Sequence, residues 1–300
     1  MPLLWSSNCL IARAASGVIA PRTLALSRWS LACVLMLPLA WRGLHRAGRP
    51  WLLAEWRQLL VLGGLGMWIC GAFVYIGGQS TSPANIALIY AASPIGIALA
   101  SAVLLGERMS PGQMLGVALA LAGVLFVIAK GDLRNLLAVR FSIGNGWIVV
   151  AAVAWTGYSV LLRPWSSRRG MAERLVAITG GGIVVLIPFT ALEWALVAQP
   201  PFSPKALGLA AAAAVLPGMV AYQAYSFMLR ELGAARTALV LYLGPVYAAL
   251  SAWVLLSEPP QAYHAIGAAM ILPSIWFATR VAARPAVAAD LQARSRSADK

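Results

Sequence analysis

The sequence predicts an all-α polytopic membrane protein in which ten transmembrane helices form two inverted five-helix repeats. Three observations lead to this prediction: the composition, the number of long apolar runs, and the duplication of one stretch of the chain. Of the 300 residues, 61% are hydrophobic and 11% are charged, whereas soluble domains average about 45–50% and about 25%. The composition therefore excludes a water-soluble globular domain.

Apolar runs long enough to cross a bilayer occur ten times along the chain. The predicted spans are 2–16, 22–41, 57–77, 83–105, 110–130, 143–162, 171–197, 205–229, 234–256 and 260–281. They divide the chain into a first repeat (1–130), a periplasmic connector (131–142), a second repeat (143–281) and a basic cytoplasmic tail (282–300).

The duplication emerges when the sequence is compared with itself at an offset of 151 residues. Thirteen of the 38 pairs from position 84 to 121 are identical, and they include Pro94 with Pro245 and Glu107 with Glu258. Each copy is an apolar run with a proline in its middle and a carboxylate at its end. Because five spans per copy is an odd number, the second copy enters the membrane with the opposite orientation, as in many transporters.

The basic residues predict which way the chain is inserted. With both termini in the cytoplasm, sixteen lysines and arginines lie on the cytoplasmic side and six lie outside, as the positive-inside rule requires. This topology explains the net charge of +14 better than nucleic-acid binding does, since the basic residues are spread among loops instead of clustered on one face. No nucleic-acid partner is predicted.

The residues that carry most cofactor and enzyme chemistry are sparse and scattered. Cys9, Cys33 and Cys70 lie in apolar spans without metal-ligand spacing, and His45 and His264 have no ligand partner near them in the sequence. Walker A, HExxH and GxSxG patterns are missing from the sequence. We therefore predict a protein that is not an enzyme, with no catalytic residue, metal or cofactor.

Several of these motifs resemble the EamA family of the drug/metabolite transporter superfamily. The resemblance rests on Trp5-Ser-Ser-Asn8 with Arg13 and Pro21, on Arg28, and on Ala87-Leu-Ile-Tyr90 with Pro94 and the Leu-Leu-Gly-Glu107 ending. It extends over essentially all ten spans. The resemblance implies two inverted five-helix halves, a central cavity between them, and export of small metabolites by alternating access.

Pro94 and Pro245 are predicted to kink spans four and nine, because proline has no backbone N–H and crowds the carbonyl four residues earlier. The kinks are symmetric hinges or static bends, and their duplication favours hinges. Glu107 and Glu258 end the same two spans. They either stabilise the N-terminus of the next helix, by about 0.3–1 kcal/mol, or carry a coupling ion. Arg28 lies inside span two, where it either recognises an anion or extends toward the interface.

Aromatic residues at helical spacing predict a substrate site near the bilayer midplane. Trp5 and Trp155 align at an offset of 150, and Asn8 and Tyr158 follow them one turn later. Rings with a polar atom suit a zwitterion with an apolar side chain, although the same stripes suit tight helix packing. The predicted substrate-binding residues are Trp5, Asn8, Tyr75, Tyr90, Trp155, Tyr158, Tyr222 and Tyr242.

The predicted function is export of small metabolites, including aromatic amino acids, across a bacterial inner membrane. The predicted partners are this small-molecule substrate and membrane lipid. A membrane-embedded transferase-type enzyme and a non-transporting membrane subunit are the alternatives. Glu173 lies at the edge of the predicted span 171–197, and Glu193, a turn or two from the other end of that span, is the one acidic residue further inside a predicted span. The sequence therefore favours gradient-driven efflux over obligatory proton exchange.

Overall fold

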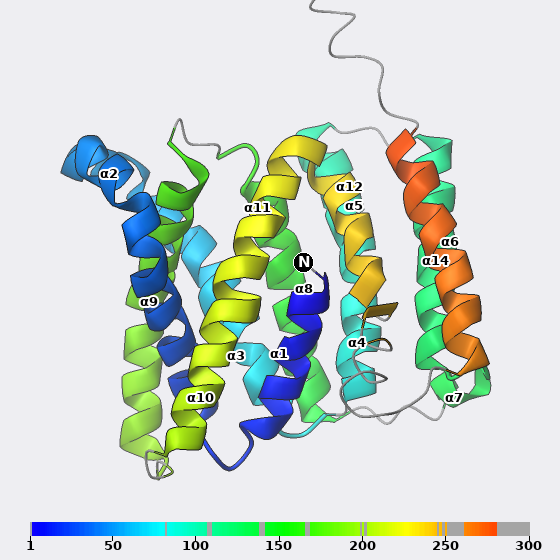
Figure 1. The fold of residues 1–300 in the computed structure, drawn as a ribbon, viewed down its shortest axis with the longest axis horizontal. Helices are drawn as coiled ribbons and strands as arrows, with labels where there is room; N and C mark the ends of the chain where they lie inside the picture. Colours follow the sequence, from blue (N-terminus) through cyan, green and yellow to red (C-terminus); the bar gives the residue numbers. More distant parts are fainter. Residues whose placement is uncertain are drawn as a thin grey trace, which may run out of the picture.

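The computed structural model describes residues 2–81, 83–106, 110–137, 142–165, 169–198, 200, 203–244, 246–247, 250 and 261–280. Within these ranges the chain is helical, contains no β-strand, and forms a bundle (Figure 1). In chain order the helices are α1 (Pro2–Ala14), α2 (Pro21–Gly63), the π-helix η1 (Gly64–Ile69), α3 (Cys70–Gly77), α4 (Pro83–Ala91), α5 (Ser93–Leu105), α6 (Pro111–Ile128), α7 (Arg134–Leu137), α8 (Ile143–Leu161), α9 (Met171–Leu196), α10 (Pro204–Ala213), the π-helix η2 (Ala214–Val220), α11 (Ala221–Leu232), α12 (Ala234–Val240), the 3-10 turn η3 (Leu241–Leu243) and α14 (Ala262–Arg280).

Among the described residues, seven helical segments are long and apolar enough to cross a membrane. They are Pro21–Arg46, Pro50–Gly77, Asn85–Leu105, Pro111–Ile128, Ile143–Leu161, Met171–Leu196 and Pro204–Leu232. Each coincides with one predicted span, and the described parts of the other three spans contain α1, α12 with η3, and α14. Large apolar side chains such as Leu39, Trp41 and Val103 are exposed, as expected of a surface that faces lipid. The chain is therefore a polytopic membrane protein.

A reversal at Gly48 divides α2 into two membrane-length helices. Gly48 has φ 65° and ψ −177°, a backbone conformation that residues with a Cβ rarely adopt. Pro50 follows, and proline is well suited to the first turn of a new helix. The separate spans predicted at 22–41 and 57–77 are therefore confirmed, and the structure extends them to Pro21–Arg46 and Pro50–Gly77.

The fourth predicted span is broken at Ala92, between α4 and α5. Pro94 has no N–H to donate to the Tyr90 carbonyl, so the regular pattern stops here. The next helix begins with a hydrogen bond from the Gly96 N–H to the Ala92 carbonyl, 3.0 Å long. The interruption lies two residues before Pro94, and the kink and hinge at Pro94 stay predictions.

Two π-helices interrupt the third and eighth predicted spans at corresponding places. The first residues of η1 and η2 are Gly64 and Ala214, a separation close to the offset of the sequence repeat. Each π-helix ends with a wide-turn hydrogen bond, from Cys70 N–H to the Leu65 carbonyl and from Ala221 N–H to the Leu216 carbonyl. Such segments occur frequently at functional sites.

Glycines allow two pairs of helices to approach closely. In the pair α2 and α9, a Cβ atom on Gly182 would lie 3.0 Å from the Gly63 carbonyl oxygen. In the pair α6 and α14, a Cβ on Gly123 would lie 3.0 Å from the Gly267 carbonyl. Small residues at helix crossings are the usual means by which membrane helices reach close contact.

The buried apolar residues form two cores. The larger core includes residues of α2, η1, α3, α8, α9 and α11, and the half-buried Trp5 of α1 packs against it. The smaller core lies among α4, α6, α12, η3 and α14 and contains Ala91, Val117, Ala120, Val124, Leu239, Tyr242 and Ile271. The candidate site described next belongs to the larger core.

Some predictions fall outside the described residues. These are the helix-end carboxylates Glu107 and Glu258, the second predicted hinge Pro245, part of the connector 131–142, and the tail 282–300.

Candidate functional site

Six aromatic side chains from four helices meet in the larger core. We call this group the aromatic cluster: Trp5, Trp29, Trp155, Tyr158, Tyr222 and Tyr225. The centroids of the Trp5 and Trp155 rings are 4.9 Å apart in an edge-to-face arrangement, and those of Trp29 and Tyr222 are also 4.9 Å apart. Edge-to-face and offset contacts of this kind stabilise aromatic pairs by about 0.5–1.5 kcal/mol beyond their burial.

Helical spacing explains why pairs of these rings share a face. Trp155 and Tyr158 are three residues apart on α8 and stack with centroids 5.4 Å apart. Tyr222 and Tyr225 are three residues apart on α11, and Tyr225 contacts Trp155 at 4.7 Å. Residues at this spacing lie on the same side of a helix. Trp5 therefore contacts Trp155 of α8 and both Tyr222 and Tyr225 of α11.

A buried arginine lies directly beside the aromatic cluster. Arg28 of α2 is 2% exposed, and its guanidinium lies 4.4 Å from the centre of the Trp29 ring. Its Nη1 donates to Asn8 Oδ1 (3.3 Å) and to the Tyr75 hydroxyl (3.0 Å), and its Nη2 donates to the Pro217 carbonyl (3.0 Å). The Tyr75 hydroxyl donates in turn to Asn8 Oδ1 at 2.7 Å. We call Arg28, Asn8 and Tyr75 the polar triad.

Main-chain carbonyls of both π-helices accept hydrogen bonds from the site. In η1, Met67 accepts from Trp29 Nε1 (3.0 Å) and Gly66 accepts from the Tyr222 hydroxyl (3.1 Å). In η2, the Pro217 carbonyl accepts from Trp5 Nε1 (3.3 Å) as well as from Arg28. The two irregular segments therefore face the same group of side chains, one from each half of the chain.

The structure brings together six of the eight predicted substrate-binding residues, namely Trp5, Asn8, Tyr75, Trp155, Tyr158 and Tyr222. Tyr90 is half-buried at the edge of the same core, where its hydroxyl lies 3.6 Å from Cys70 Sγ. Tyr242 lies in the smaller core instead. The reason is that Tyr242 belongs to the 3-10 turn η3, which packs against α6 and α14.

Three residues at the centre of the site were absent from the predicted set. Tyr225 shares a helix face with Tyr222, and its spacing could have indicated its place. Trp29 stands next to Arg28 without any repeat or motif to single it out. For Arg28, the sequence leaves two roles open, anion recognition and extension toward the interface. Arg28 is buried in the bundle, so extension toward the interface is wrong.

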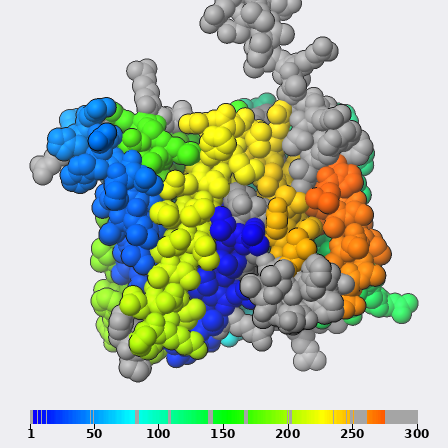
Figure 2. Space-filling view, viewed as in Figure 1, coloured from blue at the N-terminus to red at the C-terminus, as the bar shows by residue number. Residues whose placement is uncertain are grey.

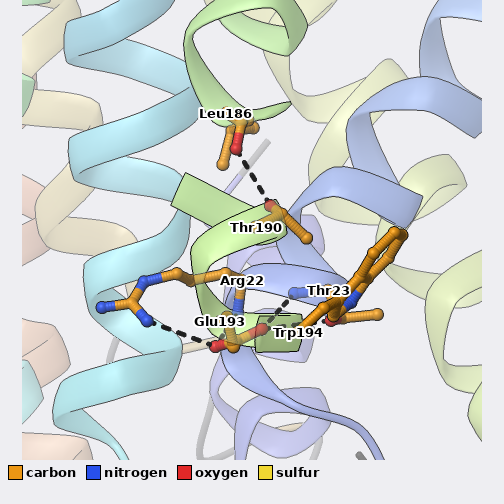
Figure 3. Close-up of polar contacts among 6 residues, drawn as sticks. All are labelled: Arg22, Thr23, Leu186, Thr190, Glu193 and Trp194. Carbon is orange, nitrogen blue, oxygen red and sulfur yellow. Dashed lines mark hydrogen bonds and ion pairs between the residues drawn. The ribbon is translucent and has the colours of Figure 1, made fainter. Parts of the chain in front are cut away.

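A second buried polar contact joins α9 to the N-terminus of α2 (Figure 3). Glu193 is 4% exposed, and its carboxylate accepts hydrogen bonds from the backbone N–H groups of Arg22 (3.1 Å) and Thr23 (2.9 Å). The Arg22 guanidinium lies 3.8 Å from the same carboxylate, and Trp194 donates to the Thr23 hydroxyl at 2.8 Å. Glu193 thus supplies the helix cap that the local sequence lacks, because residue 20 is an alanine.

The described residues contain no group of three or more His, Cys, Asp or Glu side chains placed to hold a metal ion. What the site offers is apolar ring surface beside a cation, several hydroxyl groups and main-chain carbonyls. Such a combination binds a small molecule with an apolar part and a charged part.

A sequence profile of the EamA-like transporter family matches residues 1–129 and, a second time, residues 142–280. The chain belongs to the EamA-like transporter family. An uncharacterized transporter of Archaeoglobus fulgidus is 26% identical to this EamA-family chain over 281 residues, which are 92% of this chain and 94% of that protein. The uncharacterized inner membrane transporter YedA of Escherichia coli K12 is 26% identical over 257 residues, 83% of this chain and 78% of YedA.

A third similar protein is the "probable terminal-alkyne amino-acid exporter" of Streptantibioticus cattleyicolor, 28% identical over 209 residues, which are 68% of this EamA-family chain and 66% of that protein. A protein of known crystal structure, 21% identical, superposes with a TM-score of 0.73 over 94% of each chain. This superposition shows that the two share a fold. The family and the named relatives are transporters, so the chain is a member of a family of membrane transporters.

Proposed function

We propose that this EamA-family transporter exports amino acids with apolar or aromatic side chains across the inner membrane by alternating access. The observation that carries the proposal is the direct contact between the aromatic cluster and the polar triad. The rings supply apolar surface for a side chain, and the triad with the π-helix carbonyls supplies donors and acceptors for charged groups. A small zwitterion with an apolar side chain matches both parts.

The names of two relatives support the location and the substrate class. YedA is named as an inner membrane transporter, and the Streptantibioticus relative is named as an amino-acid exporter. Because both are less than 30% identical to this chain, their names support the proposal without deciding it.

Two inverted five-helix repeats form the architecture on which the proposal rests. The 151-residue offset, the two separate matches to the family profile and the corresponding positions of η1 and η2 all support a duplication. With five spans in each repeat, ten helices cross the membrane and both termini lie in the cytoplasm. The π-helices then face each other across the interface between the repeats, where the substrate binds near the midplane.

Helix α1 is the element that opens the site in this proposal. It lies at the surface, beside α10 and α11 (Figure 2), and carries both Trp5 of the aromatic cluster and Asn8 of the polar triad. Each of the six rings contacts at least one other ring of the cluster, so a substrate must separate some of them. A displacement of α1 separates Trp5 from Trp155 and frees an acceptor position at Pro217 in one movement.

Export from cells and from proteoliposomes tests the proposal. Cells that express the protein should resist toxic analogues of aromatic amino acids, and liposomes loaded with radiolabelled L-phenylalanine should release it faster when they contain the protein. Trp155→Ala should lower the efflux rate on the order of tenfold, since it removes ring contacts to Trp5 and Tyr225, and Tyr90→Ala should lower it less.

The matched control is Trp41→Ala, because Trp41 is 61% exposed on the outside of the bundle. This variant should export as the unmodified protein does. Unchanged efflux in both Trp155→Ala and Tyr90→Ala would remove the proposed site. Efflux of no amino acid by the unmodified protein would remove the proposed substrate class.

A further inference from the structure

Arg28 is a buried cation with neutral partners. Its described acceptors are an amide oxygen, a hydroxyl and a main-chain carbonyl, from Asn8, Tyr75 and Pro217. No carboxylate of the described residues forms an ion pair with it. A charge removed from water is costly unless an opposite charge accompanies it, and the cost is greatest inside a membrane. The site is therefore electrostatically incomplete without an anion.

The unused part of the guanidinium has a definite geometry. Of its five N–H donors, Nη1 uses two and Nη2 uses one, whereas the buried Nε has no hydrogen-bond partner. The Nε–H and one of the two Nη2 hydrogens lie along one edge of the planar group. Two parallel donors of this kind match the two oxygens of a carboxylate.

The neighbours of Arg28 direct a ligand to this edge. Trp29 covers one face of the guanidinium, so an anion approaches along the edge and not from above that ring. Gly218 of η2 lies beside Nε, and a Cβ on that residue would be 3.5 Å from the nitrogen. Because Gly218 has no side chain, no β-carbon covers the Nε edge on that side.

We propose that Arg28 binds the carboxylate of the transported substrate through its Nε and Nη2 donors. This proposal rests on the proposed function and specifies one half of the recognition. The aromatic cluster receives the apolar side chain, and Arg28 selects for the acid over its amide or amine. Asn8 and Tyr75 hold the guanidinium in place through Nη1 and leave the recognition edge to the substrate.

A purely structural Arg28 is the competing explanation, since the side chain also connects α1, α2, α3 and η2. The two explanations differ in what they predict for ligands. A structural arginine affects stability and does not distinguish a carboxylate from its amide, whereas a recognition arginine makes this distinction in the unmodified protein, before any mutation is introduced.

Binding to the full-length protein in lipid nanodiscs tests the proposal, with L-phenylalanine, L-phenylalaninamide, 3-phenylpropanoate and phenethylamine as probes. The two carboxylates should bind on the order of 10- to 100-fold more tightly than the amide and the amine. Arg28→Gln should abolish this preference, and Arg28→Lys, which keeps the charge and loses the paired donors, should retain part of it. Arg230→Gln is the control, because Arg230 is exposed and pairs with Glu231.

The outcomes separate this proposal from the proposed function. Equal binding of phenylalanine and its amide would overturn the role of Arg28 and leave amino-acid export intact. Binding of 3-phenylpropanoate without phenylalanine would overturn amino-acid export and retain the carboxylate site. Binding of none of the four probes would overturn both. If Arg28→Gln does not fold, the comparison of acid with amide in the unmodified protein still decides.

Discussion

Glu193 and Thr23 are 170 residues apart in the sequence and are joined by two hydrogen bonds, since the carboxylate accepts from the Thr23 N–H at 2.9 Å and from its hydroxyl at 3.1 Å. The contact ties the C-terminal part of α9 to the first turn of α2. A negative charge at a helix N-terminus interacts favourably with the helix dipole. The first turn of α2 is therefore held by a carboxylate from the other half of the chain.

Glu193→Ala should destabilise the protein by about 2–3 kcal/mol, because it removes a helix cap and leaves buried donors unpaired. Thermal unfolding in detergent, followed by circular dichroism, measures the effect. The control is Glu231→Ala, since Glu231 is exposed and pairs with the adjacent Arg230, and exposed ion pairs contribute about 0–1 kcal/mol. Equal losses of stability in the two variants would contradict the capping role.

Gly182→Ala should destabilise the contact of α9 with α2 and η1 by about 1–3 kcal/mol, because the added Cβ would lie 2.5 Å from Met67 Cβ of η1 and 3.0 Å from the Gly63 carbonyl oxygen of α2. Gly180→Ala on the same helix is the matched control, since a Cβ there has no neighbour within 4 Å. That control should be neutral or stabilising by about 0.5–1 kcal/mol. Melting temperatures of the two variants should therefore move in opposite directions, and a shift in the same direction would argue against close packing at Gly182.

The positions of the helices were predictable from the sequence because lipid imposes a minimum length on every apolar run. The interruption between α4 and α5 was also predictable, because Pro94 has no N–H to donate. The π-helix η1 was not predictable in this way, because Gly64–Ile69 has the sequence of an ordinary apolar helix. In η2 (Ala214–Val220), Pro217 lacks an N–H and marks an interruption, but its residue type does not specify a π-helix.

The candidate site was predictable in part, for a similar reason. Trp5 and Trp155 were found through the repeat, and Tyr222 through helical spacing. Tyr242 was grouped with them because its residue type and its span were suitable, yet η3 directs it into the smaller core. The polar triad depends on long-range contacts, such as that between Tyr75 and Asn8, which no local pattern specifies.

Pro94→Ala should slow export severalfold while stability stays the same or rises. Alanine restores an N–H that can donate to the Tyr90 carbonyl, so α4 and α5 become one stiffer helix. Such a change removes a hinge, and the restored hydrogen bond offsets the loss of the buried proline ring atoms. The measurement is the efflux rate from proteoliposomes beside the melting temperature.

The control for this variant is Pro111→Ala. Pro111 occupies the first turn of α6, where proline interrupts no hydrogen bond, so export should be unaffected. If Pro94→Ala exports at the unmodified rate, the break at Ala92 is a static bend.

Export should proceed down the substrate gradient without obligatory proton exchange. Proton-coupled carriers place an Asp, Glu or His within the membrane, where it exchanges protons between the alternating states. Among the described residues the one buried carboxylate is Glu193, and both of its oxygens are occupied at the N-terminus of α2. A pH gradient imposed on proteoliposomes should therefore cause no accumulation of L-phenylalanine against its gradient. Glu193→Gln should also retain downhill efflux when it is assayed well below its melting temperature.

Accumulation of L-phenylalanine driven by a pH gradient would show that export is coupled to protons, and the three glutamine variants would then locate the coupling residue. Glu107 and Glu258, which end the fourth and ninth predicted spans, are the carboxylates that could exchange protons at a hydrated membrane edge. If a pH gradient alone drives accumulation, and Glu107→Gln or Glu258→Gln abolishes it while downhill efflux persists, export is proton-coupled through that residue. If Glu193→Gln abolishes accumulation in the same way, the buried carboxylate releases α2 during transport, and its role extends beyond the helix cap. If export is uncoupled, the final distribution of substrate across the liposome membrane should be the same with and without the pH gradient. This should hold for the unmodified protein and for Glu107→Gln, Glu258→Gln and Glu193→Gln.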